Sequence, residues 1–177
     1  MRTMYHCTLV IILVLCTVAH AAKPGDLYTA LNTSDYIWLK RRSYNLTGHT
    51  CVLASRISLN KTDYKFHQNY TVGTEKKSLI LYGKLNDTVE NPYMIVSNVS
   101  GQGGRMYTLK YWNDTETCGI LTLNLRMSGQ QQCEMHVWET NINKTVTECD
   151  KEYKKLCENR TYDVYLKTCE RNAAQRN

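Results

Sequence analysis

Polar and apolar residues alternate in eight short runs that follow one another through most of the chain. A period of two is typical of a β-strand with one buried face, and the glycine, proline and asparagine residues between the runs indicate turns. The connections are too short for the crossovers that parallel strands require, so consecutive strands should be antiparallel. The predicted strands are 37–44, 51–60, 64–72, 78–85, 93–99, 106–112, 119–126 and 132–140.

Eight antiparallel strands in succession predict an all-β fold, an up-and-down β-barrel, which removes exposed sheet edges and can enclose one small ligand. A β-sandwich is the main alternative. A weak helical pattern begins at Gly25, and the run TECDKEYKKLCE from Thr147 has its acids early and its lysines late, which suits the helix dipole. We therefore expect a short N-terminal helix, the barrel, and a C-terminal helix.

The first residues have the features of a secretory signal peptide. Arg2 precedes the apolar run CTLVIILVLCTV at 7–18, and Ala19-His20-Ala21 is a small-x-small cleavage site. The run is shorter than the ~20 residues of a membrane span, and no later segment is apolar enough for one. We expect a signal peptide over 1–21 and a secreted, monomeric chain over 22–177 that forms one domain and has no membrane partner.

The cysteine count agrees with secretion. Of the eight cysteines, Cys7 and Cys16 lie in the signal peptide, which leaves six. An even number in a secreted chain predicts three disulfides and no free thiol, although the spacing alone allows many connectivities. The remaining cysteines are Cys51, Cys118, Cys133, Cys149, Cys157 and Cys169.

Sites for N-linked glycans are dense along the chain. The Asn-x-Ser/Thr pattern predicts a glycosylated surface position wherever it occurs in a secreted protein. It occurs at Asn32, Asn45, Asn60, Asn69, Asn86, Asn98, Asn113, Asn143 and Asn159.

The net charge of +6 is mildly basic and is not concentrated. Lys40-Arg41-Arg42 and Lys76-Lys77 are short clusters, and acids separate the other basic residues. A nucleic-acid partner would require a basic stripe on one face. We interpret these clusters as solvated surface charge, with no nucleic acid bound.

The stretch QQCEMHVWETNINKTVTEC places Cys133, Glu134 and His136 close enough to suggest a metal site or a nucleophile. Strand parity argues against both, because Glu134, His136 and Trp138 should face one way while Cys133 faces the other. A thiol nucleophile would also need Cys133 unpaired. We expect no enzyme activity, no catalytic residue, no metal and no cofactor.

Several segments in their order along the chain carry a family resemblance: DLYTALNTSDYIWLKRRSYN, TCVLASRISLN, LKYWNDTETCGILTLN, CEMHVWE, and ECDKEYKKLC followed by TCE. Together they resemble the salivary lipocalins of ticks, the histamine-binding protein family, over almost all of the mature sequence. The resemblance implies a lipocalin barrel with the disulfides Cys51–Cys169 and Cys118–Cys149, which leaves Cys133 and Cys157 as the third pair.

The amine binders of that family share a motif of Cys-Asp-aliphatic, a gap, Glu-Leu-Trp/Tyr, a gap and Cys. Here Gly119 stands where the Asp should be, and Glu134-Met135-His136 keeps only the Glu. A buried ammonium needs a carboxylate partner, so the loss of one acid removes one cation site. If Gly119 faces inward like the family's Asp, the leucines at 121, 123 and 125 face inward too. Such an apolar wall with one acid suits a lipid mediator or a single aromatic amine.

The family also places a ligand-contacting tyrosine at the position of Tyr44. Each of the other candidates has a plainer interpretation: the aromatic residues as barrel core, Glu134 as a salt-bridge residue, and His136 as a satisfied polar group. The candidate ligand-binding residues are Glu134, Tyr44, Trp38, Tyr107, Leu121, Leu123, His136 and Trp138.

These observations predict a secreted salivary lipocalin that sequesters a small host mediator during blood feeding. The ligand would be a biogenic amine such as histamine or serotonin, or a lipid mediator such as a leukotriene, with a base such as Arg56 or Lys110 meeting a lipid carboxylate. The alternative is a protein–protein inhibitor of a host defence protein, for example of complement, that uses the barrel surface. A family member whose pocket has closed is the plainest possibility.

Overall fold

The alternation along the sequence forms one antiparallel sheet in the computed structural model, which describes residues 21–127, 130–157 and 161–169. Except for Ala21, the predicted signal peptide over 1–21 lies outside the described residues, as does Asn159. The helices are α1 (Asp26–Leu31), the short 3-10 helix η1 (Glu139–Asn141) and α2 (Thr147–Leu156). The strands are β1 (Ile37–Arg42), β2 (His49–Leu59), β3 (Asp63–Val72), β4 (Glu75–Asn86), β5 (Tyr93–Ser97), β6 (Arg105–Asn113), β7 (Cys118–Met127), β8 (Gln130–Trp138) and β9 (Tyr162–Asp163).

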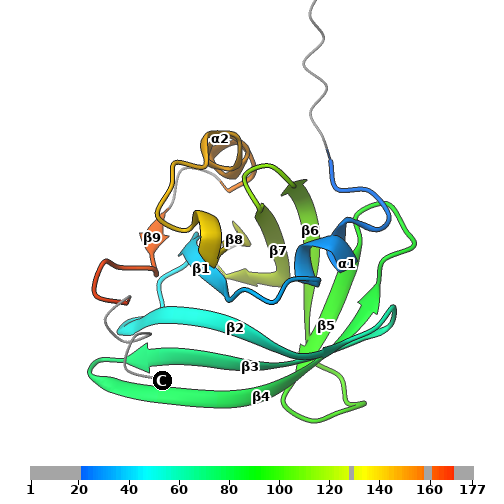
Figure 1. Ribbon diagram of the computed structural model, residues 1–177, viewed down its shortest axis with the longest axis horizontal. Coiled ribbons are helices and arrows are strands. Elements are labelled where there is room, and N and C mark those ends of the chain that lie inside the picture. The colour runs from blue at the N-terminus through cyan, green and yellow to red at the C-terminus, as the bar shows by residue number, and fades with distance from the viewer. Residues whose placement is uncertain (1–20, 128–129, 158–160, 170–177) are drawn as a thin grey trace, which may run out of the picture.

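The sheet closes into a barrel because β1 pairs with β8 on one side and with β2 on the other. From β2 to β8, each strand pairs antiparallel with the next strand along the chain, which is the up-and-down order. In Figure 1, β2, β3 and β4 form one side of the ring, and β6, β7 and β8 form the other. The barrel is therefore confirmed over the β-sandwich. The short β9, which pairs with β1, was not predicted.

Strand ends differ from the prediction where a turn or an exposed run begins. The segment predicted as 37–44 stops at Arg42, and the last strand stops at Trp138, where η1 follows. Strand β4 starts at Glu75, before the predicted residue 78, because the exposed Lys76 and Lys77 pair with β3 as strand residues. The sequence pattern missed them because neither face of β4 is buried there.

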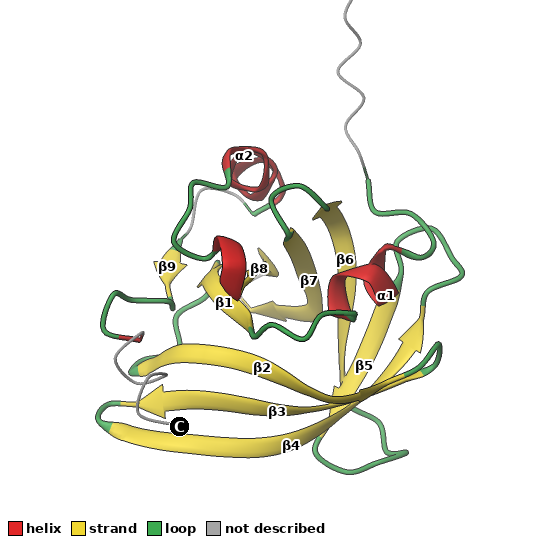
Figure 2. Ribbon diagram, viewed as in Figure 1, coloured by secondary structure: helices red, strands yellow, loops and turns green. Residues whose placement is uncertain are grey.

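Helix α1 packs into one end of the barrel (Figure 2). It follows Gly25, whose φ of 93° is one that glycine adopts without strain and that offers no side-chain cap. The cap comes instead from Asp87, just after β4. Its carboxylate accepts hydrogen bonds from the backbone N–H groups of Leu27 at 3.1 Å and Tyr28 at 3.0 Å. The buried residues of α1 that join the inner core are Leu27, Ala30 and Leu31.

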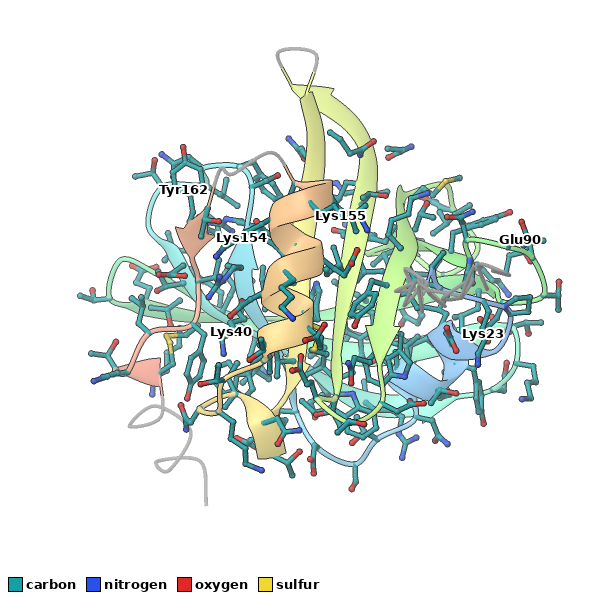
Figure 3. All side chains as sticks on the ribbon, turned by 90° about the horizontal axis from the view of Figure 1, so that it is seen from above. Lys23, Lys40, Glu90, Lys154, Lys155 and Tyr162 are labelled. Atoms are coloured by element: carbon teal, nitrogen blue, oxygen red, sulfur yellow. A yellow bond between two sulfur atoms is a disulfide. The ribbon has the colours of Figure 1, made fainter. Side chains whose placement is uncertain are left out.

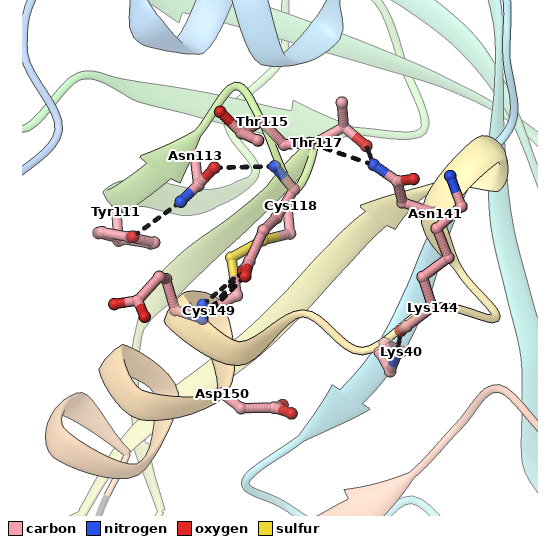
Figure 4. Close-up of a disulfide and its surroundings, with 12 residues drawn as sticks. Lys40, Tyr111, Asn113, Thr115, Thr117, Cys118, Asn141, Lys144, Cys149 and Asp150 are labelled. Atoms are coloured by element: carbon pink, nitrogen blue, oxygen red, sulfur yellow. Dashed lines mark hydrogen bonds between the residues drawn. A yellow bond between two sulfur atoms is a disulfide. The ribbon is translucent and has the colours of Figure 1, made fainter.

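Helix α2 lies against the outer face of β6, β7 and β8, with the exposed Lys154 and Lys155 on its far side (Figure 3). Its first turn is also capped from a distance. The Glu116 carboxylate accepts hydrogen bonds from the N–H groups of Glu148 and Cys149, each at 3.0 Å (Figure 4). In the described part of the chain, no helix combines the length and the apolar character needed to cross a membrane.

Three disulfides join the pairs that the family resemblance implied. Cys51–Cys169 connects β2 to the segment after β9 across 118 residues. Cys118–Cys149 and Cys133–Cys157 fasten α2 to β7 and β8 (Figure 4 shows the first of these two). All six cysteines of these disulfides are buried in one cluster of side chains between the barrel and α2, which we call the outer cluster. This outer cluster is therefore covalently tied, whereas the inner core of the barrel is held by packing.

The interpretation of Lys40-Arg41-Arg42 as solvated charge is wrong. Arg42 is only 4% exposed, and Arg41 forms an ion pair with Asp150 at 3.1 Å. The Lys40 ammonium donates to the carbonyl of Ile142 at 3.1 Å, and burial lowers the pKa of Lys40. The cluster lies inside a layer formed by α2, β9 and the loop after β1, which a sequence pattern does not reveal.

Candidate ligand-binding site

An apolar cavity of about 80 Å³ lies inside the barrel, between α1 and the inner faces of the strands. It is larger than the space one water molecule needs, so side chains do not completely fill the barrel interior. Its walls are mostly aliphatic and aromatic, and a cavity of this kind with a few convergent polar groups is the usual form of a small-molecule site. The polar side chains along the wall are Tyr64, Gln68, Tyr107, Glu134 and His136.

Glu134 is the acid in this wall, among the residues that the structure describes, and it is 6% exposed. It lies on β8, opposite Leu121 of β7 and Arg42 of β1. Both carboxylate oxygens have partners. The Tyr44 hydroxyl donates to Oε1, and His136 Nε2 lies 2.9 Å from Oε2. The carboxylate is thus held in a fixed orientation by two side chains.

The surroundings of Glu134 keep it ionised. Burial alone raises the pKa of its carboxyl, but hydrogen bonds from His136 and Tyr44, with the charges of His136 and Arg105, together hold that pKa below its ordinary value. Burial and the nearby Glu134 charge raise the pKa values of the Tyr44 and Tyr107 phenols. Both phenols therefore stay protonated; the Tyr44 hydroxyl donates to Glu134, and the Tyr107 hydroxyl accepts a hydrogen bond from Arg105. The cavity wall carries a fixed negative charge in a largely apolar space.

Arg42 positions the loop that carries Tyr44. Its guanidinium donates to the carbonyl of Tyr44 at 3.2 Å, of Leu46 at 2.8 Å and of His49 at 3.0 Å. Its central carbon lies 5.3 Å from the centre of the Tyr44 ring. The buried arginine thus fixes the β1–β2 loop, so that the Tyr44 hydroxyl reaches Glu134.

Gly119 lines the cavity, and its neighbours fill the space that a side chain there would take. A Cβ atom on Gly119 would lie 3.2 Å from Leu109 Cδ1, 3.3 Å from Trp112 Cε3 and 3.4 Å from the carbonyl oxygen of Tyr111. The position where amine binders of the resembled family have their Asp is therefore occupied by apolar side chains here. Among the described residues, Glu134 is the acid that remains in the wall.

Comparison with known proteins places this geometry in a family. The model of the tick histamine-binding protein family matches residues 19–171. The chain belongs to this family. No curated protein sequence matches the chain.

Solved structures share the fold at low sequence identity. The serotonin complex of AM182 has a TM-score of 0.64 and 16% identity, over 84% of this chain and 94% of that one. Japanin from Rhipicephalus appendiculatus bound to cholesterol has a TM-score of 0.58 and 12% identity, over 77% of this chain and 95% of that one. Apocrustacyanin C1 has a TM-score of 0.56 and 10% identity, over 85% of this chain and 84% of that one.

Most of the candidate residues in this member of the tick family come together at the cavity. Glu134, His136, Trp138, Tyr107 and Leu121 line it, and Tyr44 reaches it through the Glu134 carboxylate. The strand parity predicted for β8 is therefore borne out, because Cys133, Met135 and Val137 are buried in the outer cluster under α2.

Two candidates do not line the cavity. Trp38 lies in the outer cluster, with its ring 4.9 Å from that of Tyr165, while its neighbours Ile37 and Leu39 point into the barrel. Leu123 is buried but lies outside the cavity wall. The two bases predicted to meet a lipid carboxylate do not line the cavity either. Arg56 binds the side-chain oxygen of Asn32 at 2.6 Å, and Lys110 binds that of Asn91 at 3.0 Å.

Sequence reasoning missed one wall of the cavity and one base. Tyr64, Phe66 and Gln68 of β3 all face it, which the alternation over 64–72 could have shown. Arg105, at the start of β6, hydrogen-bonds Tyr107 and contributes charge near Glu134. Nothing in the sequence around Arg105 separates it from other exposed bases.

A group of Glu116, Cys118 and Cys149 has its ligand atoms within 4.8 Å of one another, as a metal site would require. The two sulfur atoms are bonded to each other, and the Glu116 carboxylate caps α2. Neither cysteine is a thiolate that could bind a metal. The group therefore has a structural role, because the disulfide and the carboxylate both hold the start of α2 against β7.

Proposed function

We propose that this protein captures one biogenic amine in the barrel, with the ammonium of the amine paired to Glu134. The observation that carries the proposal is a buried, ionised carboxylate in the wall of an otherwise apolar cavity. The carboxylate is hydrogen-bonded by Tyr44 and His136, and an organic ammonium would add a cationic partner that can also fill apolar space.

The rest of the cavity supports an aromatic ligand. Phe66, Trp112 and Trp138 line it, and the rings of the two tryptophans are centred 5.6 Å apart. Aromatic faces attract both other rings and cations. The small volume and the filled space beside Gly119 favour one amine over two. The serotonin bound by AM182 is a ligand of this chemical class.

In this proposal the protein is secreted into tick saliva and acts by stoichiometric binding, so that the mediator is withdrawn from the host during feeding. The family match and the three disulfides support this location and role. A lipid mediator is a weaker fit, because Glu134 would repel its carboxylate. Inhibition of a host protein is also weaker, since the exposed large apolar side chains, such as Leu46, Ile80 and Val99, come from separate loops and strands.

Calorimetry on the wild type and on Glu134→Gln tests the proposal. The wild type should bind serotonin or histamine at one site. Gln keeps the shape of the side chain but removes the charge, and charge-assisted hydrogen bonds exceed neutral ones by about 1.4 kcal/mol, so amine affinity should fall about tenfold. A leukotriene should bind the variant equally or more tightly.

The matched control is Glu90→Gln, which removes an exposed acid from the β4–β5 loop and should leave amine affinity unchanged. Two equivalent histamine sites, or amine binding indifferent to Glu134, would contradict the proposal. Native mass spectrometry of the secreted protein provides a second measurement, since the proposal expects a co-purified mass in the range of a small amine.

A further inference from the structure

The hydroxyl of Tyr64 is a buried polar group without a hydrogen-bond partner among the described residues. The residue is 2% exposed and lies on β3, where Tyr64, Phe66 and Gln68 share the inward face and all line the cavity. Its ring stacks on Phe66 with the centroids 4.5 Å apart. Because the hydroxyl is the tip of an inward-pointing ring, it is the atom of this side chain that reaches farthest from the strand. An unpaired buried hydroxyl costs free energy, so a partner is needed to explain it.

Tyr64 and Glu134 lie on different parts of the cavity wall. Around the ring, β3 is separated from β8 by β1 and β2. Along the barrel, Glu134 pairs with Arg42, whose guanidinium binds the carbonyl of His49 at the start of β2. Tyr64 instead pairs with Leu59 at the other end of β2. Both side chains line the same cavity, so a ligand paired with Glu134 lies in the space that Tyr64 also lines.

The end of the cavity near Tyr64 is closed by α1. The β2–β3 turn contacts α1, since the Lys61 ammonium lies 4.0 Å from the centre of the Tyr28 ring. Leu27, Ala30 and Leu31 of α1 are in the same inner core as Tyr64. The charge of Arg56 acts on the Tyr64 phenol, but the Arg56 guanidinium is hydrogen-bonded to Asn32 at 2.6 Å, and the Tyr64 hydroxyl has no hydrogen-bond partner among the described residues.

We propose that Tyr64 donates a hydrogen bond to an acceptor on the far end of the bound amine, and that the ligand is consequently an aromatic monoamine with a ring hydroxyl. This inference rests on the proposed function, because it assumes the ammonium on Glu134. The Tyr64 hydroxyl would be a second polar contact, besides Glu134, and would discriminate between amines. Burial raises the pKa of the Tyr64 phenol, so the group remains protonated and available as a donor.

Serotonin and tryptamine provide the test, because they differ only in the ring hydroxyl. Calorimetry should show that the wild type binds serotonin about tenfold more tightly than tryptamine, the scale of one hydrogen bond to an otherwise unpaired buried group. Tyr64→Phe should remove that preference by weakening serotonin about tenfold, with tryptamine changed less than about twofold.

A second measurement separates a ligand-binding role from a structural one. Without ligand, Tyr64→Phe should unfold at the same or a higher temperature than the wild type, because the variant no longer buries an unpaired hydroxyl. The matched control is Tyr111→Phe. Tyr111 is 7% exposed, lies in the outer cluster and accepts a hydrogen bond from Asn113 at 3.3 Å. That control should keep the preference for serotonin and lose some stability.

The outcomes distinguish this inference from the proposed function. If Tyr64→Phe weakens both amines equally, or leaves the preference for serotonin intact, the hydroxyl binds water or nothing and the inference is overturned. Amine binding at Glu134 stands in that case, provided that Glu134→Gln weakens both amines. If the wild type binds neither amine, the proposed function fails and the inference fails with it.

Discussion

At the scale of single residues, the Glu134 carboxylate has protein donors on both oxygens before a ligand arrives. An incoming ammonium would replace or share the contacts that His136 and Tyr44 make with this carboxylate. Because the pKa of Glu134 is lowered in the folded state, ionised Glu134 contributes stability that is fully present above its unfolded pKa of about 4.3. That contribution is lost as the pH falls through the lower folded value.

Urea unfolding from pH 7 to about pH 2.5 measures this contribution. The wild type should lose it below about pH 4, whereas Glu134→Gln should lack that component of the pH dependence. His136→Gln removes the partner that lowers the pKa of Glu134 most. This variant should therefore begin to lose the stability that ionised Glu134 contributes at a higher pH than the wild type does. Identical pH profiles for the wild type and Glu134→Gln would show that Glu134 is not ionised in the folded protein.

The surroundings of the single residue Gly119 decide whether a second acid could be added to the cavity wall. Gly119→Asp should not create a second amine site, since Leu109 and Trp112 occupy the space. It should instead destabilise the protein by about 1–3 kcal/mol through overpacking. Gly119→Ala, which adds the same Cβ without charge, should account for much of that loss in thermal unfolding. A stable Gly119→Asp variant with two amine sites would contradict this account.

At the scale of elements, both helices have their N-termini capped by a carboxylate from a distant part of the chain. Asp87 caps α1 and Glu116 caps α2. Asp87→Ala should destabilise the protein by about 1 kcal/mol, speed hydrogen exchange in α1, and accelerate ligand release, because α1 covers one end of the cavity. The change keeps the Asn86-x-Thr88 glycosylation pattern. Asp26→Asn, in the first turn of the same helix, is the control and should have a much smaller effect, because the Asp26 side chain is only half-buried and accepts its hydrogen bond from Lys23 outside the helix.

The strands β8 and β1 and the helix caps show what the sequence could and could not predict. The β8 alternation was informative because one face meets the cavity and the other meets α2, with polar and apolar residues divided between them. In β1, Ile37, Trp38 and Leu39 are all buried, so the alternation could not tell which side Trp38 faces. The helix caps and the carbonyl partners of Arg42 depend on residues that are close only after folding, and no local pattern encodes them.

At the scale of the whole molecule, the glycosylation sites differ in accessibility. Asn32, Asn45, Asn60, Asn98 and Asn143 are exposed. Asn113 is half-buried, its side-chain nitrogen donates to Tyr111 at 3.3 Å and its oxygen accepts from the N–H of Glu116 at 2.8 Å. We expect glycans on the exposed set and little or none on Asn113. Peptide mass spectrometry after enzymatic deglycosylation measures each site, and full occupancy of Asn113 in folded protein would contradict the prediction.

The Cys51–Cys169 bond has a consequence for the synthesis of the protein. In a secreted chain made at about 5–20 residues per second, Cys51 enters the oxidising compartment roughly ten seconds before Cys169, because 118 residues separate them. During that interval, Cys118 and Cys133 arrive first and are the available partners for Cys51. A polypeptide released before Cys169 would leave Cys51 either unpaired or joined to one of these earlier cysteines. The bond therefore forms only in molecules whose translation has passed Cys169, so a chain shortened before that residue cannot join β2 to the segment after β9.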